Sequence, residues 1–233
     1  MEIGLSGNPP SGILLIDKPT GITSHDVVYQ VRNKTGVRKV GHTGTLDPLA
    51  TGLLIILVGR EFTRRQSEFL KQDKEYLCKI QLGLETDSYD VDGQITKEVS
   101  WKELEKISQL DLEKVLDKFK GEIIQIVPAF SAVKVKGQKL YEKARRGEID
   151  KNDLPSRKVN IKELELIDFK KDEENQSIFF NIKVACSSGT YIRSIAHDVG
   201  QELGVGATVS ELRRTKIGEL KIESSITLQS FVA

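Results

Sequence analysis

Cysteine, proline, methionine and tryptophan are all scarce in this chain. Its 233 residues include 2 Cys, 6 Pro, 1 Met and 1 Trp. Two cysteines are too few for a disulfide framework, and 38% hydrophobic residues with 30% charged residues exclude a collagen-like or disordered chain. Cys78 and Cys186 each lie in an alternating apolar pattern, so we expect reduced thiols in the core. At this length we expect one large domain over residues 1–233.

Long hydrophobic runs are also missing. The longest aliphatic stretch, Leu53 to Val58, has six residues, whereas a membrane-spanning helix needs about 20. The N-terminal sequence MEIGLSGNPPSG has no basic segment followed by an apolar one, so no secretory signal is predicted. We therefore expect a cytoplasmic protein that does not enter a membrane.

The pattern of possible ligands argues against a bound metal ion. The three histidines, His25, His42 and His197, share no ligand spacing with one another or with the cysteines. The acidic segment from Ser88 to Gly93 resembles a calcium loop, but Glu98 falls one residue short of the terminal ligand position. A turn rich in Asp and Gly is the better interpretation of this segment.

Apolar periodicity predicts both strands and helices. Buried or half-buried strands are expected at residues 12–17, 53–58, 76–82 and 180–186, and helices at 24–36, 110–119 and 192–203. Thr23 and Asp26 form a capping-box pattern before the first helix. Because the strands are separated by both turns and helices, without a steady βαβ rhythm, we predict an α+β fold with a mixed sheet.

Positive charge is concentrated although the formal net charge is only +1. Between residues 131 and 147 the local net charge is +5, contributed by Lys134, Lys136, Lys139, Lys143, Arg145 and Arg146 against Glu142. A solvated helix face and a surface for an anionic partner both fit this segment. Smaller basic groups at 64–65, 157–158 and 213–216 favour the anionic partner more weakly.

One acidic residue stands out in the glycine-rich segment GHTGTLDPLATG. No Gly-Lys-Ser/Thr follows, so the segment is not a P-loop. Asp47 precedes Pro48, a dipeptide that marks an ordinary turn more often than a catalytic site. The two glycines and the polar residues His42, Thr43 and Thr45 before it would let a ligand approach the backbone closely.

The stretch GHTGTLDPLATGLL resembles the signature of the TruB family of tRNA pseudouridine synthases. Further segments match in the same order: LLIDKPTGITS, DKEY, GLETDSYDVDG, FSAVKVKGQKLYEKARRGE, CSSGTYIRSIAHDVG and ELRRTKIG. The resemblance covers most of the chain. It implies a pseudouridine-synthase-like fold, in which a mixed, largely antiparallel central sheet is flanked by helices and loops.

The resemblance also implies a set of site residues. Asp47 would be the catalytic aspartate, Tyr76 would contact the target base, and Arg193 would pair with the aspartate. Four further positions would lie around the substrate: His42, Lys134, Tyr191 and Leu212. The basic segment at about 130–148 would be an insertion that clamps the RNA. Family members commonly continue into a C-terminal RNA-binding domain of the PUA type, and this chain is expected to lack one.

The implied reaction breaks the bond from ribose C1′ to base N1, turns the uracil and joins C5 to C1′. Nothing is oxidised, so no cofactor or metal is required. A carboxylate starts the reaction either as a nucleophile at C1′ or as a base that removes the 2′ hydrogen, and residue identity leaves both open. The expected partner is the T stem-loop of tRNA, bound by a monomer. A tRNA-folding chaperone and a nucleoside hydrolase remain rival hypotheses.

Overall fold

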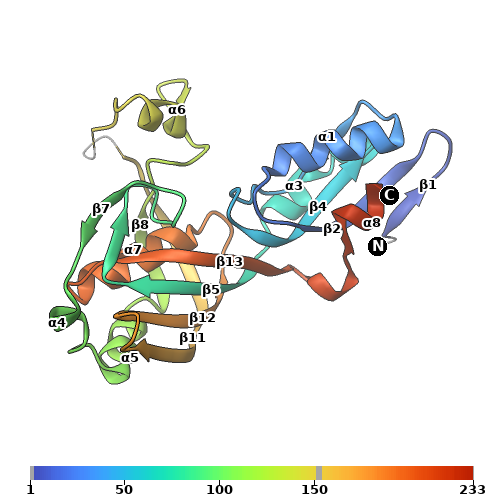
Figure 1. Cartoon of the computed structure of the whole chain (residues 1–233). Helices are drawn as coiled ribbons and strands as arrows, with labels where there is room; N and C mark the ends of the chain where they lie inside the picture. The colour runs from blue at the N-terminus through green and yellow to red at the C-terminus, as the bar shows by residue number, and fades with distance from the viewer. Residues whose placement is uncertain (1–2, 151–153, 233) are drawn as a thin grey trace. The chain divides into compact units, whose positions relative to one another are not determined.

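The computed structural model describes residues 3–150 and 154–232, and the chain divides into two compact units (Figure 1). The first unit takes in the residues up to Leu77 and those from Leu212 onward, and the second comprises Cys78 to Glu211. The chain passes from one unit to the other within two strands, β5 (Lys74–Leu82) and β13 (Ala207–Ile217). Helices and a mixed, largely antiparallel sheet confirm the predicted α+β fold.

The first unit is built around β4 (Thr51–Val58), whose residues from Gly52 onward are all buried. Strand β2 (Ser11–Lys18) pairs antiparallel with β4, and β13 joins β4 in parallel at Arg213 and Arg214. Burial on both faces explains the continuous apolar run in the sequence. The short strands β1 (Gly4–Ser6), β3 (Val40–His42), β14 (Leu220–Lys221) and β15 (Ile226–Thr227) extend this part of the sheet.

Helix α1 (Ser24–Thr35) begins and ends where the sequence predicts. The Thr23 side chain accepts from the backbone N–H of Asp26, the Asp26 carboxylate accepts from the N–H of Thr23, and Gly36 ends the helix with a φ of 70°. Val27, Val28 and Val31 form its buried face. Shorter helices complete the unit: α2 (Arg60–Thr63), α3 (Gln66–Leu70), a 3₁₀ turn (Ile222–Ser224) and α8 (Leu228–Val232).

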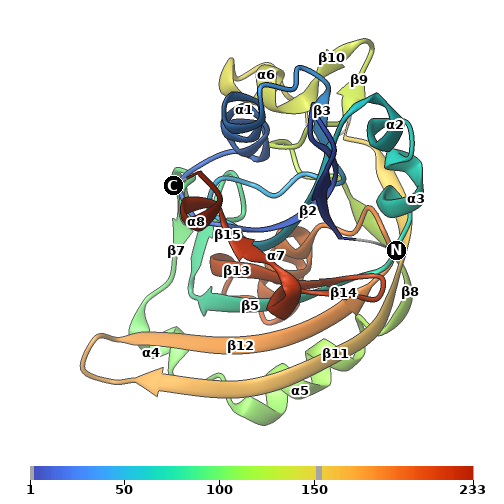
Figure 2. The ribbon, with the colours of Figure 1, turned by 90° about the vertical axis from the view of Figure 1, so that its right-hand side faces the viewer.

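The second unit contains the long hairpin of β11 (Ser156–Asp172) and β12 (Ser177–Cys186), which Figure 2 shows with α5 beside it. Every second residue of β12 is buried, as its alternating pattern predicts. Strand β8 (Gly121–Ile126) pairs with the first part of β11. The remaining elements are β6 (Leu84–Thr86), β7 (Ile95–Glu98), α4 (Trp101–Leu104), α5 (Gln109–Asp117), β9 (Lys134–Val135), β10 (Gln138–Lys139), α6 (Leu140–Arg145) and α7 (Ile192–Glu202).

Several sequence predictions are confirmed at the level of single residues. Cys78 and Cys186 are free thiols in the core, and α7 buries its apolar stripe. Helix α5 ends at Asp117, two residues before the predicted boundary.

Among the described residues, no group of three or more His, Cys, Asp and Glu side chains could hold a metal ion. No helix in the described part of the chain is long and apolar enough to span a bilayer.

Candidate active site

The loop that carries Asp47 connects β3 to β4 in the first unit. Ser24 fixes it from the start of α1: the Ser24 hydroxyl accepts from the Leu46 N–H at 2.8 Å and donates to the Leu46 carbonyl at 3.1 Å. The Asp47 carbonyl accepts from the Ala50 N–H at 3.1 Å, which closes a turn through Pro48. Asp47 itself is partly exposed. The backbone on both sides of the carboxylate is therefore held in place.

Lys18 supports the same loop from the end of β2. Its side chain is fully buried, and its ammonium group donates to the carbonyls of Pro19 at 2.8 Å, Ile22 at 2.7 Å and Pro48 at 3.3 Å. Burial lowers the pKa of the Lys18 ammonium to about 8, and the charge of Asp47 opposes this shift. The buried ammonium group of Lys18 thus contacts the backbone of Pro48, the residue that follows Asp47.

A second buried cation, Arg214, reaches the loop from β13. Only 1% of Arg214 is exposed. Its Nε donates to the Leu53 carbonyl at 2.8 Å and its guanidinium donates to the Gly44 carbonyl at 3.3 Å. The preceding Arg213 forms an ion pair with Asp17 at 2.6 Å. The basic group at 213–216, which the sequence only weakly linked to an anionic partner, therefore has two of its cations bound to the protein itself.

His42 lies at the end of β3, before the loop. The Gln66 side-chain amide donates to the His42 carbonyl at 2.7 Å. Burial, followed by the charge of Arg214, lowers the pKa of the imidazole. We expect a neutral imidazole at physiological pH, because an unperturbed histidine titrates near 6.5. No signal in the sequence indicated Gln66, because a polar helix residue is not specific, and Arg214 was indicated only as part of a basic group.

Two further predicted residues belong to the first unit. Tyr76 lies in β5 on the buried side of the strand, as the alternating pattern predicts, and it is 8% exposed. Leu212 is buried in β13, and its carbonyl accepts from the Thr51 hydroxyl at 3.4 Å. His42, Asp47, Tyr76 and Leu212 are thus all held in elements of one unit.

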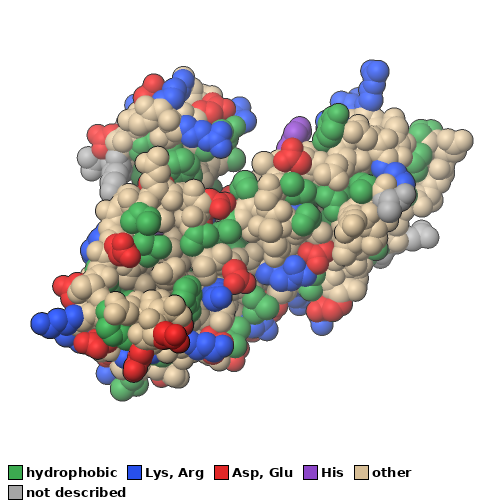
Figure 3. All heavy atoms as spheres, in the orientation of Figure 1, with side chains coloured by type: hydrophobic (Ala, Val, Ile, Leu, Met, Phe, Trp, Pro, Cys, Tyr) green, Lys and Arg blue, Asp and Glu red, His purple; other side chains and the backbone are tan. Residues whose placement is uncertain are grey.

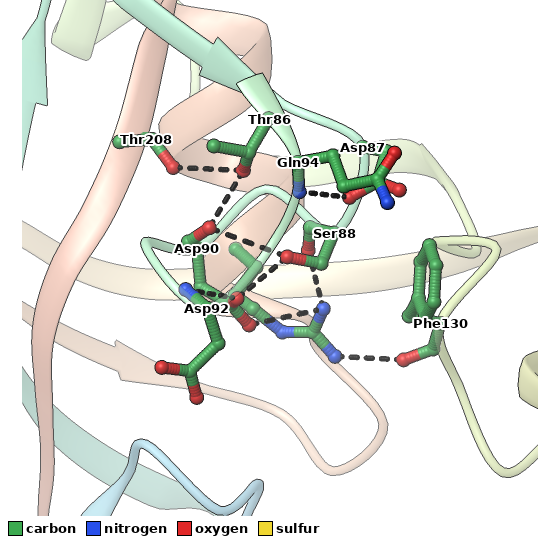
Figure 4. Close-up of polar contacts among 9 residues, drawn as sticks. Thr86, Asp87, Ser88, Asp90, Asp92, Gln94, Phe130 and Thr208 are labelled. Carbon is green, nitrogen blue, oxygen red and sulfur yellow. Dashed lines mark hydrogen bonds and ion pairs between the residues drawn. The ribbon is translucent and has the colours of Figure 1, made fainter. Parts of the chain in front are cut away.

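Arg193 lies in the first turn of α7 in the second unit. The sequence pattern places it just off the apolar stripe, yet only 4% of it is exposed. Its guanidinium is 3.5 Å from an Asp90 carboxylate oxygen and donates to the carbonyls of Ser88 and Phe130, the latter at 2.9 Å. Figure 4 shows these acceptors converging on one guanidinium group.

Asp90 is a functional candidate that the sequence interpretation missed. Its carboxylate accepts from the Ser88 hydroxyl at 2.6 Å and from the Asp92 N–H at 3.2 Å, and its carbonyl accepts from the Thr86 hydroxyl at 2.6 Å (Figure 4). The prediction of a turn is consistent with these local contacts. What the local pattern could not reveal is that this turn faces a buried arginine 103 positions later in the chain.

A ring pair attaches the same turn to α7. Tyr89, whose φ of 66° is unusual for a residue other than glycine, stacks on His197 with ring centroids 3.9 Å apart and an interplanar angle of 12°. His197 follows Arg193 by four positions, which is about one helical turn. The turn therefore contacts α7 through both Arg193 and His197.

Tyr191 and Lys134 are the remaining predicted residues, both in the second unit. Tyr191 lies directly before α7, and the Arg157 guanidinium lies 5.4 Å from the centre of its ring. Lys134 is exposed in β9, the first strand of a hairpin whose turn has positive φ at Lys136 and Gly137. Figure 3 shows Lys and Arg side chains on the surface of the segment that includes α6.

The predicted site residues are therefore divided between the two units. Asp47, Tyr76, His42 and Leu212 belong to the first, and Arg193, Tyr191 and Lys134 belong to the second. Within the second unit, Arg193 forms an ion pair with Asp90. The pairing of Arg193 with Asp47 stays a prediction.

Comparison with known proteins identifies the family. A family model described as "TruB family pseudouridylate synthase (N terminal domain)" matches residues 32–192, and one described as "tRNA pseudouridylate synthase B C-terminal domain" matches residues 193–233. The chain belongs to the TruB family. The first of these models alone covers more than half of the chain, and it includes the Asp47 loop, the Asp90 turn and the basic segment.

Individual TruB relatives are similar over nearly the whole chain. The tRNA pseudouridine synthase B of Clostridioides difficile is 44% identical over 217 residues, which is 93% of this chain and 69% of that protein. The protein of the same name from Endomicrobium trichonymphae is 44% identical over 222 residues, covering 95% and 91% of the two chains. A solved Cbf5-Nop10-Gar1 complex contains a chain with a TM-score of 0.68 and 31% identity, matching 94% of this chain and 53% of its own length.

Proposed function

We propose that this TruB-family chain converts a uridine in the T loop of tRNA, at position 55, to pseudouridine. The observation that carries the proposal is the Asp47 loop. Its sequence is the family signature, and buried polar side chains of Lys18, Ser24 and Arg214 fix its backbone on several sides. A carboxylate on a fixed backbone meets the need of the reaction for a group positioned at the ribose.

In the proposed mechanism the C1′–N1 bond breaks, the uracil turns, and C5 bonds to C1′. The proton on C5 leaves and N1 gains a proton, so no atoms are lost. Asp47 starts the reaction as a nucleophile at C1′ or as the base that takes the 2′ hydrogen. Arg193 keeps the carboxylate ionised and oriented through charge-assisted hydrogen bonds. Tyr76 stacks on the extruded base, and its hydroxyl can relay the C5 proton.

Reaching the uridine requires flipping it out of the folded loop, at a cost of a few kcal/mol. His42, which we expect to be neutral, occupies the vacated space or contacts the RNA, and Tyr191 and Leu212 line the base. The basic segment from residue 130 to 148 attracts the RNA backbone and clamps it. We propose that a monomer in the cytoplasm performs the reaction, and light scattering coupled to size-exclusion chromatography checks the monomer.

The decisive experiment incubates the purified chain with an unmodified tRNA transcript and maps pseudouridine by carbodiimide-dependent stops in reverse transcription. The reaction contains no added metal or nucleotide. Asp47→Asn is the inactive variant, and Asp92→Asn, which changes an exposed carboxylate, is the matched control. We expect a T-loop signal that is lost with Asp47→Asn and kept with Asp92→Asn.

Other outcomes support the rival hypotheses. Refolding of tRNA that survives Asp47→Asn, without a pseudouridine signal from the original chain, would favour a folding chaperone. Release of free uracil would identify a nucleoside hydrolase. A signal elsewhere in the tRNA would retain the synthase activity and overturn the T-loop assignment.

A further inference from the structure

Gln125 is an internal glutamine with an unusual set of contacts. It is the next-to-last residue of β8, and it is fully buried. Its side-chain oxygen accepts from the Tyr191 N–H at 2.7 Å, and its side-chain nitrogen donates to the Tyr191 carbonyl at 2.9 Å. One amide group thus satisfies both backbone polar groups of one residue, as a neighbouring strand would.

These contacts lie where α7 needs external support. Tyr191 is the residue directly before the helix, and no side chain caps this end. The first turn contains Arg193 and Ser194, and the Ser194 hydroxyl donates to the Ile126 carbonyl at 3.1 Å. Together with the two bonds from Gln125, this contact ties the end of β8 to the start of α7. The first turn of α7, which contains Arg193, is therefore linked to a strand residue that lies 66 positions before Tyr191 in the chain.

We propose that Gln125 is a positioning residue for the reaction: it fixes Tyr191 and the first turn of α7, and through them the guanidinium of Arg193. The inference rests on the proposed function, because it assigns Arg193 and Tyr191 to the site. Gln125 acts through the backbone of Tyr191. A small displacement of a catalytic group lowers rates strongly, by up to about 100-fold per ångström, so the effect should appear in the chemical step.

The test replaces Gln125 by methionine, which has a similar length and makes neither hydrogen bond. We expect the single-turnover rate with saturating tRNA to fall by about tenfold or more, while the Kd for tRNA changes less than about twofold. Ile178→Val, which trims a fully buried side chain in β12, is the control for a general loss of stability. All rates are compared at a temperature at which each variant is folded by circular dichroism.

A double-mutant cycle separates positioning from general stability. If Gln125 acts through the first turn of α7, Gln125→Met and Arg193→Lys are not additive, and the glutamine matters little once the guanidinium is gone. Ile178→Val and Arg193→Lys should be additive. Full additivity of Gln125→Met, or an unchanged single-turnover rate, would overturn the proposal. Should Gln125→Met not fold, Gln125→Glu, which keeps the acceptor for the Tyr191 N–H, takes its place in the cycle.

Amide hydrogen exchange tests the structural premise without any activity. Exchange at residues 190–195 should be faster in Gln125→Met than in the original chain, with no such change in Ile178→Val. If the original chain makes no pseudouridine while this exchange difference is present, the proposed function fails and the contact from Gln125 to α7 stands. If the chain is active and exchange is unchanged by Gln125→Met, the positioning role fails alone.

Discussion

Asp90 and Arg193 form a buried ion pair, with a carboxylate oxygen 3.5 Å from a guanidinium nitrogen and both side chains less than 10% exposed. Burying either charge alone would be costly, because neither could recover its hydration in the interior. Further hydrogen bonds join the pair to its surroundings: the Asp90 carboxylate accepts from the Ser88 hydroxyl and the Asp92 N–H, and the Arg193 guanidinium donates to the carbonyls of Ser88 and Phe130. Arg193 therefore has a fixed orientation within the second unit before any substrate is considered.

Replacing Asp90 by alanine should destabilise the protein by up to about 3–5 kcal/mol, because it removes the carboxylate from a buried ion pair with Arg193. The rate of pseudouridine formation should also fall, even at temperatures where the variant is folded, because Arg193 loses a contact that fixes its orientation. Urea unfolding at pH 7 measures the first effect and single-turnover assays measure the second. Asp92→Ala is the matched control, since its side chain is exposed and its backbone N–H is retained, and it should change stability by less than about 0.5 kcal/mol. Equal effects of the two substitutions would contradict the importance of the buried pair.

Local signals in the sequence predict much of this fold. Helix α1 carries its capping box and its terminal glycine within the sequence itself, and β12 carries its alternation. Strand β11 was missed because its 17 residues are rich in charge and contain two register shifts, which disturb the alternation on which a prediction relies.

The candidate site was predicted only in part, for a related reason. Asp47 and Tyr76 follow from the family resemblance. The partner of Arg193 and the supports of the Asp47 loop depend on tertiary contacts that join residues far apart in the chain. Lys18 and Arg214 also break the usual rule that charged side chains are exposed. A prediction from composition and periodicity places both side chains on the surface.

Stability should depend on the ionisation of Lys18. Its pKa is lowered from 10.5 to about 8 in the folded protein, so between these values the unfolded chain binds more protons than the folded one. The free energy of unfolding should therefore rise with pH across this window, by up to about 3 kcal/mol from this group. Below pH 8 both states carry the charge and the contribution levels off at its lowest value.

Lys18→Met removes the titrating group while keeping much of its volume. Urea unfolding of both proteins at several pH values from 7 to 10 gives the difference in unfolding free energy, in which contributions from Cys78 and the surface lysines cancel. We expect the free energy of unfolding of the original chain to increase relative to that of Lys18→Met as the pH rises. A difference that stays constant over the window would show that Lys18 titrates normally.

The close approach of β4 and β13 at Gly52 should make a substitution of this glycine costly. Gly52 has a φ of 101°, and a Cβ atom there would collide with the backbone of Arg214. Gly36 also has a positive φ, of 70°, but a Cβ atom there would meet open space. Gly52→Ala should therefore cost about 1–3 kcal/mol more than Gly36→Ala, because overpacking adds to backbone strain. Thermal unfolding of the two variants makes the comparison. Equal losses of stability would show that β4 and β13 can move apart at Gly52 at little cost.

The basic segment should contribute to RNA affinity through local charge. Replacing Lys134, Lys136 and Lys139 by glutamine removes three positive charges near the hairpin of β9 and β10. The affinity for tRNA should fall at low salt, and the dependence of log Kd on log salt should flatten by up to about three units, less for RNA than for B-DNA. Filter binding over a range of KCl concentrations measures this slope.

A matched triple variant separates local charge from net charge. Lys102, Lys106 and Lys114 are exposed residues in and around α4 and α5, and replacing them by glutamine changes the net charge by the same amount. If the basic segment contacts the RNA backbone, only its own triple variant flattens the salt slope, because counterions are released where phosphates are bound. If the salt dependence of log Kd were the same in the two variants, the basic segment would act only through the total charge of the protein. The proposal that this segment clamps the RNA would then fail.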